Sequence, residues 1–324
     1  MGLQLCLFKS NTESYDITEL VSQVKWKGRK GSSSRSISVK LIDDDRDSHS
    51  RAGIEIEKGH RCTLYYDGKE LFRGLIMSTS QTDKKVLTFN AYDMGIYLTN
   101  NKDTFVYENK TADEIFRDVC TRFSLPVDRV DKCSHRIPEL NKSNTTAFDV
   151  IADALSLDYD NTNTRHFVMS DKGKLSLITR KKNILQYILS SEENILSYSL
   201  NKSLEQTKTR IKLYSNENQV LAMSKNSALE SKIGIFQDVD KPDETLNEAQ
   251  IKQLADTKLK EQGQIEKTIT CDTLGNPEII SGVGVLVQIP HLGISGTYYV
   301  DEDTHTFDGD SYKLSVKLNY AFDT

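Results

Sequence analysis

Two parts of this 324-residue sequence alternate apolar and polar residues with a period of two, which is the pattern of half-buried antiparallel strands. In the first part, residues 35–41 alternate cleanly, Asp67 and Gly68 supply a tight hairpin turn, and residues 86–92 form a further strand. The pattern returns from Ile195 and closes with a strand at 312–320. We therefore expect β-rich structure at both ends of the chain.

The two β-rich ends share a layout when their glycines are superposed. Gly59 precedes a strand, a turn and Gly74, fifteen residues later; Gly282 precedes the same features and Gly296, fourteen residues later. We interpret the two blocks as copies of one meander. The alternative is coincidence, because any two antiparallel hairpins have strands bounded by glycine. A true repeat would give one subunit two surfaces of similar shape, an arrangement that favours rings.

The middle of the chain changes to helical periodicity. Thr111 and Glu114 form a capping box that opens a helix ending before Pro126, and residues 145–157 predict a second helix. We therefore divide the chain into a β-rich unit at 1–105, a small α+β unit at 106–194 and a second β-rich unit at 195–324.

The last unit contains one helix and one polar stretch. Residues from about 215 to 244 are polar and poorly periodic, which predicts a hairpin with a long polar loop. Thr245 and Glu248 form a second capping box and predict a helix from about 245 to 263.

Charge and hydropathy exclude several classes of protein. The net charge is −5, and acidic and basic residues are interspersed, so a dedicated nucleic-acid-binding surface is not expected. Residues 1–8 lack the basic start of a signal peptide, and no segment reaches the roughly 20 apolar residues that span a bilayer. We expect a chain made in the cytoplasm without a signal peptide and without membrane insertion.

The five cysteines and two of the histidines are the strongest candidates for catalytic or metal-binding residues. An odd number of scattered cysteines argues against disulfides and for buried thiols. Cys120, Cys133 and His135 are the best constellation for a thiolate with a base or for soft metal ligands, but Cys120 falls on the apolar face of its helix, which favours core packing. His291 and His305 would form a metal pair only if they met across a hairpin; a turn histidine and a strand-end histidine are the favoured interpretation. The cysteines are Cys6, Cys62, Cys120, Cys133 and Cys271.

The acidic clusters and the tryptophan carry no site in our interpretation. The clusters lack the spaced oxygen ligands of a calcium loop, so we expect solvated turns and charges that guard strand edges. Trp26 is the only tryptophan, too few for an aromatic sugar platform. No standard catalytic motif occurs, and we predict no catalytic, cofactor-binding or metal-binding residues. The clusters are Asp43, Asp44, Asp45 and Asp47; Asp301, Glu302 and Asp303; and Asp308 and Asp310.

A series of short motifs in a fixed order along nearly the whole chain carries a family resemblance. The motifs are Gly59-His60, Leu71-Phe72-Arg73-Gly74-Leu75-Ile76, Ala91-Tyr92-Asp93, Tyr97-Leu98, Thr111-Ala112-Asp113-Glu114-Ile115, Gly296-Thr297-Tyr298-Tyr299-Val300 and His305. In this order they resemble the baseplate hub proteins of contractile phage tails and phage-like particles, of the XkdQ or late-control-protein type.

The resemblance implies a fold, a function and partners. The fold is α+β, with two tail-tube-like antiparallel β-barrel or sandwich domains on either side of the small α+β domain. The function is that of a structural hub, a homotrimer whose two barrels per chain make a pseudo-sixfold ring in a virion, tailocin or other contractile injection system. The partners are the tail tube or a tube-initiator protein, a separate spike protein and other baseplate or wedge proteins, with DNA only as cargo through the lumen.

Two other functions stay open at this point. A cell-wall hydrolase acting at the particle tip would place carboxylates with perturbed pKa values in the α+β segment. A monomeric module that binds a host-surface ligand would remain a single chain in solution.

Overall fold

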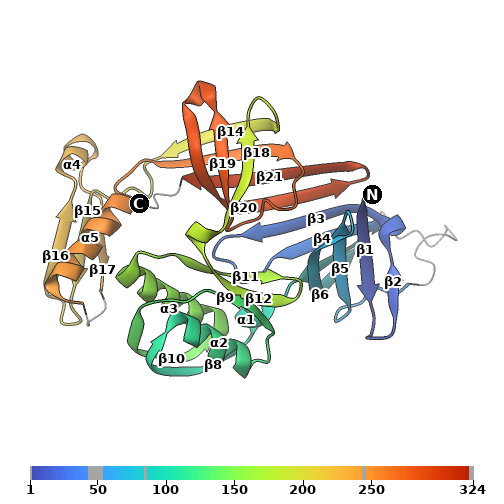
Figure 1. Ribbon diagram of the computed structural model, residues 1–324, viewed down its shortest axis with the longest axis horizontal. Helices are drawn as coiled ribbons and strands as arrows, with labels where there is room; N and C mark the ends of the chain where they lie inside the picture. Colours follow the sequence, from blue (N-terminus) through green and yellow to red (C-terminus); the bar gives the residue numbers. More distant parts are fainter. Residues whose placement is uncertain (1, 43–53, 84–85, 243–245, 321–324) are drawn as a thin grey trace.

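The computed structural model describes residues 2–42, 54–83, 86–242 and 246–320, and it is mostly β structure (Figure 1). Thirteen strands form one continuous sheet. Those of the first third are β1 (Leu3–Phe8), β2 (Ser14–Asp16), β3 (Val21–Arg29), β4 (Ser36–Ile42), β5 (Arg61–Tyr66), β6 (Lys69–Gln81) and β7 (Val86–Tyr92). Those of the later part are β13 (Ile184–Ser190), β14 (Ile195–Ser203), β18 (Glu266–Leu274), β19 (Gly284–Ile289), β20 (Ile294–Asp308) and β21 (Ser311–Tyr320).

The two β-rich segments repeat one strand order within this sheet. The first segment runs β3-β4-β7-β6-β5-β1 and the second β14-β18-β21-β20-β19-β13. Strands of the same rank in chain order occupy the same place in both segments. We call the first segment repeat 1 and the second segment repeat 2. The outermost pair differs in direction, because β1 is antiparallel to β5 whereas β13 is parallel to β19. The two repeats are joined where β20 pairs with β3.

Backbone detail aligns the repeats residue by residue. Gly59 and Gly282 both have a φ of +93°. The Gly59 N–H donates to the Ile76 carbonyl at 2.9 Å, and the Gly282 N–H donates to the Val300 carbonyl at 2.8 Å. A register shift follows Ile76 in the pairing of β6 with β7, and one follows Val300 in the pairing of β20 with β21. Ile76 and Val300 are therefore equivalent positions.

This alignment corrects the superposition of the second pair of glycines. Gly74 pairs with Cys62, two residues into β5, and the residue in the same place of repeat 2 is Tyr298, not Gly296. Glycine at 74 has a local cause, since a Cβ there would lie 2.5 Å from the Tyr92 carbonyl oxygen. The match of Gly59 with Gly282 is retained.

The middle segment contains three helices and five strands. Thr111 caps α2 in the predicted capping box with Glu114, and Thr146 accepts a hydrogen bond from the Asp149 N–H at the start of α3. The buried faces of α2 and α3 share one hydrophobic core with the strands beside them. The elements are α1 (Ile96–Asn100), β8 (Lys102–Thr111), α2 (Ala112–Arg122), β9 (Val127–Val130), β10 (Arg136–Thr146), α3 (Ala147–Thr162), β11 (His166–Asp171) and β12 (Lys174–Thr179).

The predicted long polar loop is instead a folded lobe, inserted between β14 and β18 and set at one end of the molecule (Figure 1). The hairpin of β15 and β16 is confirmed, but α4 and β17 follow it, and β17 pairs with β15. Ile211 and Leu213 pack with α5 in a small core. Because each strand has so few buried apolar positions, the sequence shows almost no strand periodicity here. The elements are β15 (Arg210–Tyr214), β16 (Val220–Lys225), α4 (Ser227–Ile233), β17 (Gln237–Asp240) and α5 (Glu248–Gln262).

The helix predicted near 245–263 is confirmed as α5, but its cap differs. Asn247 and Gln250 form the capping box, so the helix begins at Glu248. Thr245 lies outside the described residues. Among the helices that the structure describes, none is both long and apolar enough to span a membrane.

Candidate functional site

The joint between the two repeats is closed by a buried ion pair. Arg35, just before β4, donates from Nη1 to Asp303 Oδ1 at 2.9 Å and from Nη2 to Oδ2 at 2.5 Å. The Ser281 N–H also donates to Asp303 Oδ1, at 2.6 Å. A Cβ on Gly28 would lie 1.9 Å from Arg35 Nη1, so glycine in β3 gives the guanidinium room to cross the strand. The pair thus links residues 268 positions apart.

Charge and burial oppose each other at Asp303. Burial alone would raise the pKa of Asp303, but the charge of Arg35 and the hydrogen bonds from Arg35 and His305 outweigh burial and hold the pKa well below its usual range. Burial lowers the pKa of His305, against the opposing hydrogen bond and charge of Asp303. The joint is therefore held by a carboxylate and a guanidinium that are both charged.

Aromatic rings surround this ion pair. The Arg35 guanidinium lies 4.3 Å from the centre of the Trp26 ring, and His305 lies 4.5 Å from the same ring. The His305 Nδ1 is 2.8 Å from the Tyr312 hydroxyl. Trp26 is therefore a buried residue of the joint.

A second buried carboxylate orders the turn that carries Arg35. Asp93 accepts hydrogen bonds from the Arg35 and Gly95 N–H groups, both at 3.0 Å. Burial raises the pKa of Asp93 to about 7, against the lowering effect of those hydrogen bonds.

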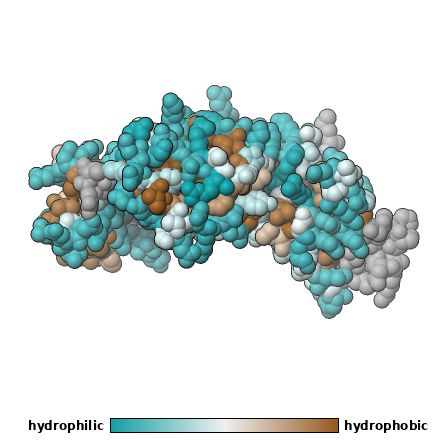
Figure 2. Space-filling view, turned by 90° about the horizontal axis from the view of Figure 1, so that it is seen from below, coloured by the Kyte–Doolittle hydropathy of each residue, from teal (hydrophilic) through white to brown (hydrophobic). Residues whose placement is uncertain are grey.

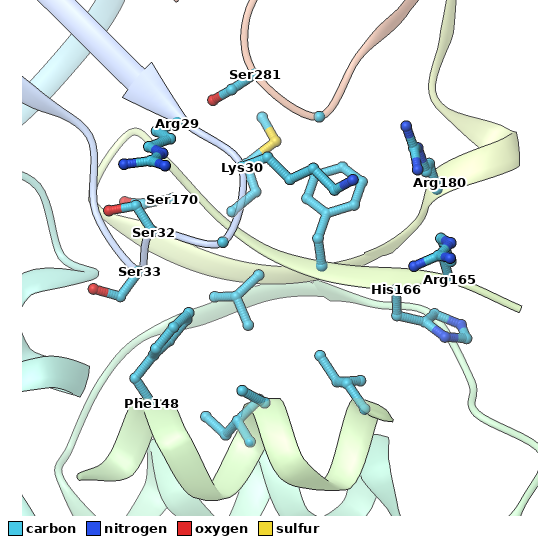
Figure 3. A pocket seen from close by; sticks show the side chains of 18 of the residues that line it. Arg29, Lys30, Ser32, Ser33, Phe148, Arg165, His166, Ser170, Arg180 and Ser281 are labelled. Atoms are coloured by element: carbon cyan, nitrogen blue, oxygen red, sulfur yellow. The ribbon is translucent and has the colours of Figure 1, made fainter. Parts of the chain in front are cut away.

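A cavity of about 320 Å³ lies beside the joint, between α3, β11 and the turn after β3 (Figure 3). Phe148, Ile151 and Leu155 of α3 give it an apolar floor. Four cationic side chains lie at its edge. Two come from the end of β3 and the turn after it, and two come from the residues next to β11 and β12. The cations are Arg29, Lys30, Arg165 and Arg180.

All four cations have partners, and Arg29 Nε lies 3.5 Å from Glu302 Oε1. Lys30 Nζ lies 3.7 Å from Asp301 Oδ1, and Arg165 Nη2 lies 2.9 Å from Glu261 Oε1. The Arg180 guanidinium stacks on the Tyr299 ring at 4.0 Å. Burial lowers the pKa of Lys30, and the neighbouring arginines lower it further against Asp301. The cavity thus offers an apolar floor, and its lining residues include no Asp or Glu.

No pattern in the sequence indicated this cavity, because its cations lie in three separate segments.

The constellation singled out from sequence, Cys120, Cys133 and His135, does not form a group of metal-ligand atoms among the described residues. Cys120 is buried in the core of the middle segment, and burial raises its pKa to about 12. Cys133 instead lies with Asp158 and His166, the only group of potential metal ligands among the residues that the structure describes. Its neighbours in this group come from α3 and β11, and neither Asp158 nor His166 was singled out from the sequence.

The two histidines of repeat 2 have separate partners. His291 lies in the predicted turn, and its ring contacts the Tyr198 hydroxyl. His305 is fully buried within β20, so the prediction of a strand-end histidine is wrong. His305 is buried there because its ring nitrogens lie beside the Asp303 carboxylate and the Tyr312 hydroxyl.

The acidic clusters differ in outcome. Asp43, Asp44, Asp45 and Asp47 lie outside the described residues. The cluster that includes Asp303 was predicted to guard a strand edge, and this is wrong because β20 pairs with β3 there. Asp308 is exposed near the β20–β21 turn and accepts a hydrogen bond from Gln23 Nε2 at 2.8 Å.

Each repeat leaves open the strand edge that corresponds to the edge used by the other repeat inside the chain. Among the described strands, β14 pairs with β18 alone and so ends the sheet. In β6, residues 78–81 pair with β7 on one side, and in the described parts of the chain no strand pairs with them on the other. These two edges are the counterparts of β3 and β20, which pair with each other inside the chain.

The inserted lobe presents a sheet face on which exposed apolar side chains lie beside charged ones. Ile211 and Leu213 point to α5, so the alternate residues of β15 and its neighbours point away. On that outer face Lys212 lies opposite Met223 and Val239, which are 48% and 56% exposed. Figure 2 shows apolar residues among hydrophilic ones at this end of the molecule. Such exposed apolar faces mark protein interaction sites.

Comparison with known proteins places the chain. A family model described as YQBQ-like matches residues 24–319. The phage-like element PBSX protein XkdQ of Bacillus subtilis (strain 168) is 31% identical over 305 residues, which are 93% of this chain and 93% of that protein.

Two solved structures share the fold. The 43 kDa tail protein of prophage MuSo2 from Shewanella oneidensis has a TM-score of 0.73 at 14% identity, covering 97% of each chain. The E. coli c3393 protein, described as a component of the type VI secretion system with structural similarity to T4 bacteriophage tail proteins gp27 and gp5, has a TM-score of 0.60 at 10% identity. That match covers 93% of this chain and 74% of the other. The fold is therefore one that occurs in phage tail proteins.

Proposed function

Because the chain belongs to the YQBQ-like family, we propose that it is a structural, non-catalytic component of a phage-like tail baseplate, in which three copies form the hub. The relative XkdQ comes from a phage-like element, and the fold is shared with a prophage tail protein. The chain is made in the bacterial cytoplasm and then built into the particle. Its proposed units are 1–105, 106–194 and 195–324.

The observation that carries this proposal is the pairing of two equivalent repeats through non-equivalent edges. Within the chain, β3 of repeat 1 pairs with β20 of repeat 2. The same contact between copies would join β14 of one chain to β6 of the next. Such a head-to-tail contact is heterologous and generates a closed ring when the rotation between repeats permits. Open strand edges are also the surfaces that readily accept another strand.

The registers fix which residues would meet. Leu200 occupies in β14 the place of Trp26 in β3. The paired residues that establish this are Trp26–Ile37–Ala91–Ile76 in repeat 1 and Leu200–Ile269–Leu318–Val300 in repeat 2. Inside the chain, Thr304 lies opposite Lys27, and their equivalents are Ser80 and Asn201. We therefore place Ser80 of one copy opposite Asn201 of the next.

The ring gives the hub its function. Three chains with two tube-like repeats each make six similar units, which match a sixfold tail tube on one side and a threefold spike on the other. The number three comes from the resemblance to hub proteins, whereas the edge-to-edge contact comes from the strand registers. The outer face of the inserted lobe is free to contact other baseplate proteins, and DNA passes only as cargo.

No observation favours the alternative of a cell-wall hydrolase. Glycoside hydrolysis needs two carboxyl groups facing each other across a sugar-binding cleft. The cavity beside the joint has no carboxylate in its lining.

Disulfide trapping tests the ring contact. Ser80→Cys with Asn201→Cys should give covalent dimers and trimers on mild oxidation, because opposed residues on antiparallel strands have Cα atoms about 4.5–5.5 Å apart, within the range for a disulfide. Both positions are exposed, and four of the five native cysteines are buried. Each single variant is the matched control and should not form trimers. The chain is tested alone and co-expressed with the spike protein; no covalent trimer in either case would overturn the proposed contact.

A further inference from the structure

Three side chains with metal-binding atoms meet inside the middle segment. Cys133 comes from the stretch between β9 and β10, Asp158 from α3 and His166 from the start of β11, and their ligand atoms all lie within 4.8 Å of one another. Cys133 is 6% exposed, and the side chains of Asp158 and His166 are 0% and 2% exposed. The cluster is therefore closed from solvent.

The polar atoms of this cluster are poorly satisfied. Asp158 Oδ2 and both ring nitrogens of His166 are buried without a hydrogen-bond partner, although Oδ2 lies 3.4 Å from Nδ1. Burying such atoms is costly unless something pairs with them. Asp158 Oδ1 is already used, since it accepts the His135 N–H at 3.0 Å, and this bond fixes the direction of the carboxylate.

We propose that Cys133, Asp158 and His166 bind a divalent metal ion of the zinc class. A thiolate, an imidazole and a carboxylate are the ligands that zinc uses in proteins. Bonds of 2.0–2.3 Å in a tetrahedron place the ligand atoms about 3.5 Å apart, close to the separation of Asp158 Oδ2 and His166 Nδ1. The other ligand atoms need only small side-chain movements. A water molecule completes the four ligands.

The metal would fasten three elements that approach from different parts of the middle segment. Cys133 has no disulfide partner, so a metal ion is the cross-link available to it. His166 also lines the cavity beside the joint (Figure 3). The site would stabilise the end of α3 and the start of β11, two elements that line the cavity beside the joint.

Metal analysis of the full-length chain tests the site directly. Reconstitution with zinc should give one equivalent per chain by elemental analysis, and cobalt in its place should give the thiolate-to-cobalt absorption that requires a cysteine ligand. Cys133→Ser and His166→Ala should weaken binding by more than the roughly 10–100-fold that loss of an outer-shell partner costs. Cys120→Ser removes another buried thiol of the same core and should bind normally.

The wild-type protein alone can overturn the proposal. A chain that takes up no stoichiometric zinc and gives no thiolate-to-cobalt absorption has no such site, even if the variants fail to fold. Cobalt absorption that is unchanged in a folded Cys133→Ser variant would contradict it equally. Neither outcome bears on the proposed ring, because none of the three ligands lies in β6 or β14.

Discussion

Replacing Asp303 by Asn leaves the buried Arg35 guanidinium without its counter-charge. Removing one partner of a buried ion pair costs about 3–5 kcal/mol. The Arg35 and Asp303 side chains are 9% and 0% exposed, so water screens the pair little. Asn retains an oxygen that can accept the Ser281 N–H, so we expect the lower end, about 3 kcal/mol. With a urea m value of about 2–3 kcal/mol per M, the unfolding midpoint should fall by about 1–1.5 M.

A matched control separates burial from charge. Arg122 and Asp103 form an ion pair with the same 2.9 Å distance, but their side chains are 35% and 45% exposed. Asp103→Asn should therefore leave the unfolding midpoint close to that of wild type, because solvent screens the exposed pair. Urea unfolding followed by tryptophan fluorescence reports directly on the joint, because Trp26 is the only tryptophan and packs on Arg35. Equal losses in the two variants, or an Asp303→Asn midpoint within 0.3 M of wild type (about 1 kcal/mol), would refute this view of the joint.

Three further predictions concern a buried carboxylate, a pair of equivalent glycines and the exposed face of the lobe. The raised pKa of Asp93, about 7, means that the folded state binds a proton more tightly than the unfolded state, so this residue contributes stability at low pH that is lost as pH rises from about 4 to 7. Asp93→Asn should lack this loss, and urea midpoints at pH 5 and 8 that fall equally in both proteins would contradict the assignment. Gly282→Ala should destabilise more than Gly59→Ala, because both share a φ of +93° but only at 282 would a Cβ lie 2.5 Å from the Phe167 ring; equal thermal shifts would argue against it. Val239→Lys on the exposed lobe face should leave thermal stability within about 0.5 kcal/mol but reduce recovery of the chain in purified particles, and unchanged recovery would remove that face from the assembly.

The features that sequence predicted best are local ones. The capping box of Thr111 and Glu114 and the turn at Asp67 and Gly68 depend on residues a few positions apart, and each occurs where the pattern placed it. Glycine spacing indicated the repeat, but the backbone registers were needed to align it. Gly74 misled the superposition because a side chain there would clash with the Tyr92 carbonyl oxygen.

The features that sequence missed depend on distant partners. Asp303 resembled an exposed charge because its partner, Arg35, lies 268 residues away. The inserted lobe resembled a loop because its buried core is small and its outer face is half polar. Cys133 was noticed, but Asp158 and His166 meet it only after α3 and β11 pack together.

The solution mass of the purified chain, measured by light scattering with and without the co-expressed spike protein, tests the hub most directly. A trimeric hub has three times the chain mass of 36.7 kDa, and we expect this mass either for the chain alone or once the spike is present. A strict monomer under both conditions would contradict it.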